Sequence, residues 1–591
     1  MKFAATPTAA TQTYALAHLP VGRIRQIFSL FPWLTAVLFI LPVLMGVTGT
    51  WLPAFGYLPD IGATAFTFSP WQQILDYPGT TSALRISLVT AWGAAVLSLL
   101  ISCALLAYSW NSSGLRWLRR SLPALLGVPH AAFAIGMMAL LAPAGWIMKL
   151  LSPWATGLES PALFSLVNDS HGFSLLLILT LKELPFVLFM SLAALSQMPV
   201  ERTQHVCRSL GYSDAAAWWR VLIPQLLPCL RLPLFAVLAY GLSVVDMALI
   251  AGPNTPPSFA VLIDRLFNHP DITMRLPGSA GASLLLLLTG LSLLLWYLLE
   301  RGGLRWIASR ASAGRRGRLH PQLHQPFTQF MNLFASLLPA VTVAAFAVLM
   351  LWSFSFRWSF PDALPSSYSL QFWLRGWEQL REPLWLTLIT GVAAALIGMV
   401  LVVACLEHEV TLRRRTGSEP RINLLWLIYV PLITPQISFL FGIQQGLLQI
   451  NAWGNWLSLV WIHLVFVIPY LFLSLSGPYR SFDDRYLRQA TSLSGSEWQA
   501  LWQVKWPMLL KPLLYVAALG FAVSVSQYLA TLYIGAGRLS TITTETVAIA
   551  SGGDRRLIGV YSLFQWLLPL LIYSCALLIP YLCFRQRKGM Q

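Results

Sequence analysis

Charged side chains are scarce in this sequence. Only 10% of its 591 residues are Asp, Glu, Lys or Arg, whereas 57% are hydrophobic, and the mean hydropathy is +0.65. Soluble domains carry roughly 25% charged residues, because their surfaces face water. A soluble fold is therefore excluded, and the composition predicts a polytopic membrane protein.

Cysteine and lysine are also rare, with six of each. All six cysteines fall in apolar runs or in loops assigned below to the inner face, so no disulfide framework is expected. A P-loop needs a lysine directly after a glycine, and no lysine here follows one. The chain is therefore expected to bind no nucleotide or other cofactor itself. His, Asp and Glu do not cluster at metal-ligand or acid–base spacing, so no metal site is predicted and a membrane-embedded enzyme is disfavoured.

Long apolar runs are abundant. A bilayer core needs about 20 apolar residues per helix, and strands of a membrane barrel would be shorter and would alternate. We therefore predict an all-α polytopic membrane protein with about 12 transmembrane helices. The runs lie near residues 30–52, 82–108, 122–145, 173–196, 230–251, 278–299, 330–352, 383–406, 422–449, 456–477, 511–533 and 560–584.

The basic residues predict the orientation. With the N-terminus inside, inner segments hold 28 of the 39 Lys and Arg residues, outer loops hold nine, and Arg85 and Lys182 lie within spans. Cytoplasmic loops of membrane proteins retain positive charge, so both termini are expected in the cytoplasm. The same bias accounts for the net charge of +17, and no nucleic-acid partner is inferred from it.

The second half of the sequence repeats the first. Residues 84–95 and 384–395 share five identical positions. The segments that begin at Pro129 and Pro435 share the pattern Pro-x-x-x-Phe-x-x-Gly, and a further match follows in the next run. Six runs per copy is an even number, so the two copies are parallel repeats.

The repeat predicts the domain organisation. We expect a first six-helix half at 1–299 and a second at 329–591. Residues 300–328, rich in Arg, Gly, His and Pro, are expected to form a solvated basic linker.

A polar, basic loop follows the fourth run of each half, at 202–224 and 485–507. Each has a small residue thirteen positions before a proline, Gly211 before Pro224 and Ser494 before Pro507. The spacing predicts a short helix, a turn, a second short helix and a proline at the start of the next span. Two such loops indicate two docking sites for a cytoplasmic partner.

These loops resemble the EAA loop of binding-protein-dependent ABC importer permeases. The family pattern is Glu-Ala-Ala, three residues, Gly, nine residues, an aliphatic residue and then Leu-Pro. Both glutamates are replaced here, and Ser494 stands at the second glycine. The matching residues are His205, Val206, Cys207, Gly211, Val221, Ile223 and Pro224 in the first loop, and Arg488, Gln489, Ala490, Ser494, Val504, Trp506 and Pro507 in the second.

The resemblance covers nearly the whole chain, and two fused six-helix halves are similar to permeases of the thiamine and ferric-iron importer group. It implies a type I permease in the bacterial inner membrane that imports a small solute delivered by an external binding protein. Two copies of a separate ATPase subunit would bind ATP and dock on the loops. ATP binding would bring the loops together and switch the halves from inward-open to outward-open. A loop that only packs on its own helices is the alternative.

Charges and prolines inside spans are candidate parts of a translocation path. Buried charge in a membrane is costly and so points to function, and interrupted helices are tolerated only beside protein or water. Adjacent helix positions diverge, so Lys182 and Glu183 should take different partners. Ordinary kinks and interhelical pairing are the alternatives. The candidates are Pro129, Pro185, Glu183, Asp246, Pro435, His463 and Pro469, and the two carboxylates would suit a cationic solute.

One other class of transporter fits twelve spans in parallel halves, the ion-coupled secondary transporters. They usually carry an Asp-Arg-Gly-Arg-Arg type loop between the second and third spans. The corresponding loop here, residues 110–120, contains no acidic residue. The ABC permease is therefore the main prediction and the secondary transporter the alternative.

Overall fold

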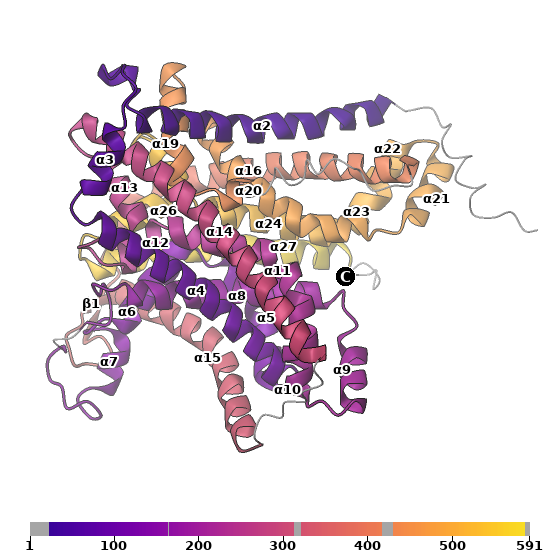
Figure 1. Cartoon of the computed structure of the whole chain (residues 1–591), viewed down its shortest axis with the longest axis horizontal. Helices are drawn as coiled ribbons and strands as arrows, with labels where there is room; N and C mark the ends of the chain where they lie inside the picture. The colour runs from indigo at the N-terminus through magenta and orange to yellow at the C-terminus, as the bar shows by residue number, and fades with distance from the viewer. Residues whose placement is uncertain (1–22, 163–164, 313–320, 417–429, 586–591) are drawn as a thin grey trace, which may run out of the picture.

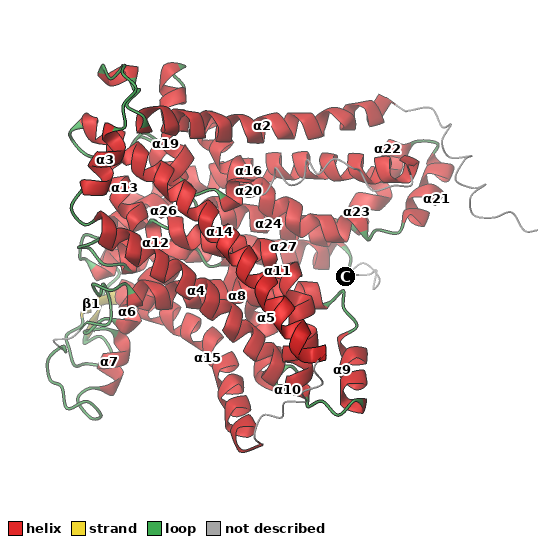
Figure 2. Ribbon diagram, viewed as in Figure 1, coloured by secondary structure: helices red, strands yellow, loops and turns green. Residues whose placement is uncertain are grey.

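The computed structural model describes residues 23–162, 165–312, 321–416 and 430–585. Within these ranges the chain is helical apart from connecting loops and a two-stranded antiparallel ladder (Figure 2). The ladder pairs β1 (Ser355–Arg357) with β2 (Ser367–Tyr368). Helices satisfy their backbone groups internally, as a lipid environment demands. The predicted all-α class is confirmed.

The helices of the first half are α2 (Arg23–Ala54), α3 (Ser69–Asp76), α4 (Thr80–Ser109), α5 (Ser113–Gly127), α6 (His130–Leu141), α7 (Trp146–Leu151), α8 (Phe173–Leu195), α9 (Val200–Ser209), α10 (Asp214–Ala217), α11 (Ile223–Ser243), α12 (Asp246–Ala251), α13 (Phe259–Phe267) and α14 (Arg275–Ser312). A π-helix (Trp218–Leu222) joins α10 to α11.

The helices of the second half are α15 (Pro321–Phe354), α16 (Gln371–Thr416), α18 (Val430–Ile433), α19 (Ile437–Gln449), α20 (Trp456–Arg480), α21 (Asp484–Ser494), α22 (Glu497–Ala500), α23 (Trp506–Met508), α24 (Leu510–Val525), α25 (Leu529–Ile534), α26 (Ile542–Ala550) and α27 (Arg555–Cys583). A second π-helix (Leu501–Lys505) joins α22 to α23.

The membrane-spanning helices agree with the predicted runs. Among the described residues, ten helices are long and apolar enough to cross a membrane, and the pair Glu497–Met508 and Leu510–Val525, bent by 73°, can form one more. The remaining predicted run, 422–449, begins outside the described residues and continues as α18 and α19.

The start of the third predicted run, at residue 122, is wrong. Its first residues belong to α5, an amphipathic helix that ends at Gly127. Pro129 then precedes α6 with extended backbone, and the spanning segment runs from His130 to Leu151. Proline lacks a backbone N–H and disfavours helix in the residue before it. It therefore separates two helices that hydropathy alone merges.

The two halves are interlocked through their first helices. α2 packs on α16 and α19 of the second half, and α15 packs on α4, α5 and α6 of the first. Glycine permits the closest crossing: a Cβ on Gly442 of α19 would lie 1.9 Å from the carbonyl oxygen of Gly46 in α2. At the matching crossing, a Cβ on Gly136 of α6 would lie 2.9 Å from the Cβ of Ala345 in α15. Small residues let membrane helices approach in this way.

The sequence repeat also has a counterpart in hydrogen bonding. Ser87 and Thr387 stand at matched positions of α4 and α16. Their hydroxyls accept from the first backbone N–H groups of α13 and α26, those of Phe259 at 2.8 Å and Ile542 at 2.9 Å. The two halves therefore hold these short helices by the same contact.

Both loops and both described ends of the chain lie at one end of the molecule. Figure 1 shows the start of α2, the end of α27, α9 and α21 on the right, with α7 and β1 on the left. At the left end, Lys149 of α7 donates to the carbonyls of Trp358 at 3.3 Å and Ser359 at 3.1 Å, which joins the halves. Seven basic residues assigned to the inner face lie outside the described residues: Lys2, Arg315, Arg316, Arg318, Arg421, Arg587 and Lys588.

Candidate functional site

The first polar loop is a helix, a glycine turn and a second helix. α9 ends at Ser209, and Gly211 follows with φ +83°. The hydroxyl of Ser213 accepts from the N–H of Ala216 at 3.3 Å and so caps α10. Arg208 spans the turn and donates to both carboxylate oxygens of Asp214, at 2.6 and 2.9 Å. These hydrogen bonds and the charge of Asp214 raise the pKa of Arg208.

The second loop has the same plan. α21 ends at Ser494, Gly495 caps it with φ +65°, and Ser496 caps α22. The left-handed position belongs to Gly495 and not to Ser494, the residue that spacing assigned to the turn. Glycine adopts positive φ without the Cβ clash that penalises other residues. Ser494 instead donates through its hydroxyl to the carbonyl of Ser496 at 3.0 Å.

Predicted loop residues have matched environments in the two halves. His205 and Val206 are exposed, as are their counterparts Arg488 and Gln489. The third position of each motif turns inward: Cys207 is buried, and burial raises the pKa of its thiol. Its counterpart Ala490 is half-buried. The later motif positions are also half-buried in both loops: Val221, Pro224, Val504 and Pro507.

Each turn also presents a leucine that sequence reasoning missed. Leu210 precedes Gly211 and is 55% exposed, and its counterpart Leu493 is 89% exposed. Single exposed leucines are common on protein surfaces, so the signal is their occurrence at the same point of both loops. The matched spacing of the loops carried this signal, because Leu210 and Leu493 occupy equivalent positions.

A π-helix connects each loop to the span that follows. In the first, the N–H of Ile223 reaches back to the carbonyl of Trp218; in the second, the N–H of Trp506 reaches the carbonyl of Leu501. The next residue is Pro224 or Pro507, and proline cannot donate to the carbonyl four positions earlier. The wider turn accommodates that missing bond. The two loops therefore lead into their spans through the same distortion.

Lys182 and Glu183 take different partners, as predicted. The ammonium group of Lys182 donates to the carbonyls of Val128 at 2.6 Å and Leu125 at 3.3 Å, at the C-terminal end of α5, where a cation is favoured. Glu183 faces His130, with Oε1 3.9 Å from Nε2. Lys182 is therefore satisfied between helices, whereas the contact of Glu183 with His130 is longer than a hydrogen bond.

Glu183 belongs to a polar group that both halves build. The ring of His130 lies 4.9 Å from that of Tyr240 on α11. Tyr240 interacts electrostatically with Asp246, Glu183 and Tyr470, the last from α20 of the second half. Asp246 is buried at the start of α12, after the break that follows α11. Two predicted path residues, Glu183 and Asp246, are thus brought together.

His463 lies elsewhere, inside the second half. Its Nδ1 is 2.7 Å from the hydroxyl of Ser524 on α24, and its Nε2 is 3.1 Å from that of Thr531 on α25. The side chain is 1% exposed. Both ring nitrogens are therefore used to hold three helices together.

The candidate prolines take two kinds of position. Pro129 and Pro435 precede α6 and α19, in the breaks where those helices begin. Pro185 and Pro469 lie inside α8 and α20 and are buried. Pro185 follows Glu183 by two residues and Pro469 directly precedes Tyr470, so each of these continuous, proline-containing helices contributes one residue to the polar group.

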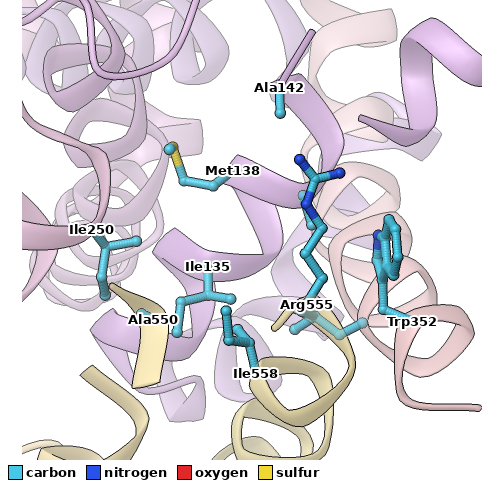
Figure 3. A pocket seen from close by; sticks show the side chains of 10 residues that line it. Ile135, Met138, Ala142, Ile250, Trp352, Ala550, Arg555 and Ile558 are labelled. Carbon is cyan, nitrogen blue, oxygen red and sulfur yellow. The ribbon is translucent and has the colours of Figure 1, made fainter. Parts of the chain in front are cut away.

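A cavity of about 170 Å³ lies between the halves (Figure 3). Ile135 and Met138 of α6 form one wall, and Trp352 of α15 and Ile558 of α27 form another. Its single charged lining residue is Arg555, which Figure 3 shows extended toward Ala142. The cavity contains none of the predicted path residues.

Comparisons with known proteins extend along nearly the whole chain. It is 31% identical over 545 residues to the inner membrane ABC transporter permease protein YnjC of Escherichia coli (strain K12), covering 90% of this chain and 96% of that protein. It is 26% identical over 212 residues to the putative 2-aminoethylphosphonate transport system permease protein PhnV of Salmonella typhi, covering 35% of this chain and 78% of that protein. No family model matches the chain.

Proposed function

Because the chain belongs to the inner membrane ABC transporter permeases, we propose that its loops at 202–224 and 485–507 are the docking sites for separate ATPase subunits. The protein is the permease subunit of an ABC importer, and an ion-coupled secondary transporter is excluded. ABC importers in general work with an ATPase and a solute-binding protein. We infer two ATPase copies, one for each loop.

The matched turns carry this proposal. In the first loop, the exposed Leu210 directly precedes the left-handed Gly211. In the second, the exposed Leu493 lies two residues before the left-handed Gly495. A short, capped helix with an apolar tip fits a groove on a partner. The π-helix and proline behind each loop connect it to the next span, so movement of the loop reaches the membrane helices.

The orientation follows from the same proposal. The end of the molecule that carries the loops would face the cytoplasm, together with both termini, since the predicted inner segments hold most of the basic residues. The opposite end, with α7 and the β1–β2 ladder, would face the binding protein.

A charge placed on each leucine tests the docking. Leu210→Asp and Leu493→Asp should each lower the amount of co-purified ATPase about tenfold or more, since an unpaired charge in a contact costs over 1.4 kcal/mol. Leu364→Asp, in the loop between β1 and β2 and 57% exposed, is the control. Normal co-purification by the double loop variant, with normal membrane insertion, contradicts the docking role.

For the solute, we propose a small cation, of which thiamine and ferric iron are examples. The support is the pair of buried carboxylates, Glu183 and Asp246, beside His130, Tyr240 and Tyr470. Buried carboxylates favour a positively charged guest.

Uptake into proteoliposomes with the cognate ATPase and binding protein tests the solute class. Thiamine, ferric iron and 2-aminoethylphosphonate, which carries both an ammonium and a phosphonate group, are compared. Glu183→Gln with Asp246→Asn should abolish uptake of the transported cation, while the His463→Gln variant keeps it. Unchanged uptake by the double variant removes the assignment.

A further inference from the structure

The second loop is fixed to α16 by a buried ion pair. Lys505, the last residue of its π-helix, pairs with Glu407 of α16. The side chains are 0% and 5% exposed. Tyr479 of α20 donates to the same carboxylate at 2.6 Å, and its ring lies 4.2 Å from the ammonium group. Three helical elements therefore meet at Glu407.

A second carboxylate on α16 holds the other end of the loop. Glu409 pairs with Arg480, the last residue of α20, at 2.9 Å from Nε and 3.0 Å from Nη2. Such two-point geometry is the strongest form of an ion pair. Arg480 comes before α21 and Lys505 after α22, so the whole docking segment lies between two charged attachments to one helix. We call these five residues, Glu407, Glu409, Tyr479, Arg480 and Lys505, the carboxylate clamp.

The first half has no acid or base at any matched position. The register that aligns 84–95 with 384–395 places Ala107 and Ser109 opposite Glu407 and Glu409. The register of the Pro185 and Pro469 segments places Leu195 and Ser196 opposite Tyr479 and Arg480. That of the loops places Leu222 opposite Lys505. Ala107, Leu195 and Leu222 are all buried.

The contrast has a mechanical consequence. Buried apolar surfaces attract without fixed direction and can slide or repack, whereas a buried ion pair that breaks leaves uncompensated charge and is strongly disfavoured. The first loop contacts α4 through a neutral hydrogen bond between Tyr108 and Trp219, whereas the second is tied to α16 by a buried ion pair. α16 is also the longer helix, 46 residues against 30 for α4.

We propose that the carboxylate clamp makes α16 the lever of the second docking loop, so that the two ATPase contacts act on the membrane helices unequally. This inference rests on the proposed docking role of the loops. Motion of the second loop passes directly to α16, and through it to α2 and α20, which pack against it. The clamp residues are positioning residues and do not contact the solute.

The test gives the second half the residue types that the first half has at two matched positions, Ala107 and Leu222. Glu407→Ala with Lys505→Leu removes both charges and leaves none uncompensated, so the variant should fold and co-purify with the ATPase at the wild-type level. Solute taken up per ATP hydrolysed should fall about tenfold, within the range that coupling residues produce. Glu300→Gln is the control, since it weakens another ion pair, Arg231–Glu300 between α11 and α14, that does not involve α16 or the second loop.

Two outcomes overturn the proposal: wild-type uptake per ATP in the double variant, or an equal loss in Glu300→Gln. A second measurement needs no ATPase. Spin labels at Ser492 of α21 and Thr411 of α16 should give a narrow distance distribution in the wild type and a broad one in the double variant. Equal widths also overturn it. Failure of the wild type to co-purify with the ATPase would instead contradict the docking role itself.

Discussion

Two glycines determine how the docking loops turn. Gly211 and Gly495 both have positive φ, and no atom beyond the adjoining residues lies within 4 Å of the position that a Cβ on Gly495 would take. The requirement at Gly495 is therefore one of backbone conformation and not of space. A side chain there costs about 1 kcal/mol because the left-handed region is strained.

Gly495→Ala should consequently loosen the second turn without a steric clash. Amide hydrogen exchange in α21 should accelerate about fivefold, which corresponds to about 1 kcal/mol. Gln489→Ala is the matched control, because it shortens an exposed side chain of α21 and leaves the hydrogen bonds of the turn in place. Equal exchange rates in the two variants would show that the left-handed conformation is not needed.

At the scale of elements, helix crossings depend on small residues. Gly442 of α19 meets Gly46 of α2, and its N–H donates to the hydroxyl of Thr50 at 3.2 Å. This crossing fixes α2 onto the other half. The counterpart, Gly136, has the same role against α15.

Gly442→Ala should destabilise the protein by about 3 kcal/mol or more, because its Cβ would overlap the backbone of α2. Thermal unfolding in detergent measures the change. Gly477→Ala in α20 is the control, since no atom lies near its added Cβ, and alanine favours helix by about 1 kcal/mol. A melting temperature for Gly442→Ala equal to that of Gly477→Ala would rule out the tight crossing.

Sequence patterns predicted the spans better than their boundaries. The apolar runs predict the positions of the helices, because each spanning helix needs its own apolar stretch long enough to cross the bilayer core. The start of the third span was misplaced because α5 is amphipathic and adjoins the span through Pro129. Likewise the spacing of the loops predicts the turn at Ser494, whereas the left-handed backbone requires glycine and uses the next residue, Gly495.

At the scale of the whole molecule, contacts between distant residues were beyond the sequence. Nothing local to Glu407 marks Lys505 as its partner, 98 positions away. The packing of α2 on the second half and of α15 on the first depends on both halves folding together. The sequence predicts only some of the residues in the polar group around Glu183. Charge within a span signalled Glu183 and Asp246, but Tyr240 and Tyr470 join them only through folding.

The halves also meet through Asp264 on α13, which lies outside the candidate spans. It accepts from the hydroxyl of Tyr533 on α25 at 3.0 Å and from Asn268 at 3.1 Å. Burial raises the pKa of Asp264 to about 6, against the opposing effect of these hydrogen bonds. The folded protein therefore holds a proton that the unfolded chain releases above its ordinary carboxyl pKa.

This contact should make stability depend on pH. A carboxyl with a raised pKa favours the folded state below its ordinary value near 4, and that contribution is lost as pH rises through about 6. Asp264→Asn should reduce the fall in melting temperature between pH 5 and pH 7.5. Asp271→Asn is the control, since hydrogen bonds from Thr273 lower the pKa of Asp271. An unchanged pH dependence in Asp264→Asn would contradict the assignment.

The most direct test of the docking role is cross-linking at the two leucines. Leu210→Cys and Leu493→Cys are placed singly in a chain whose six cysteines are replaced, and each is co-expressed with the cognate ATPase. A short thiol-reactive cross-linker should join each cysteine to the ATPase, whereas Leu364→Cys should not react with it. A complex that contains the ATPase but cross-links through neither leucine would contradict the account.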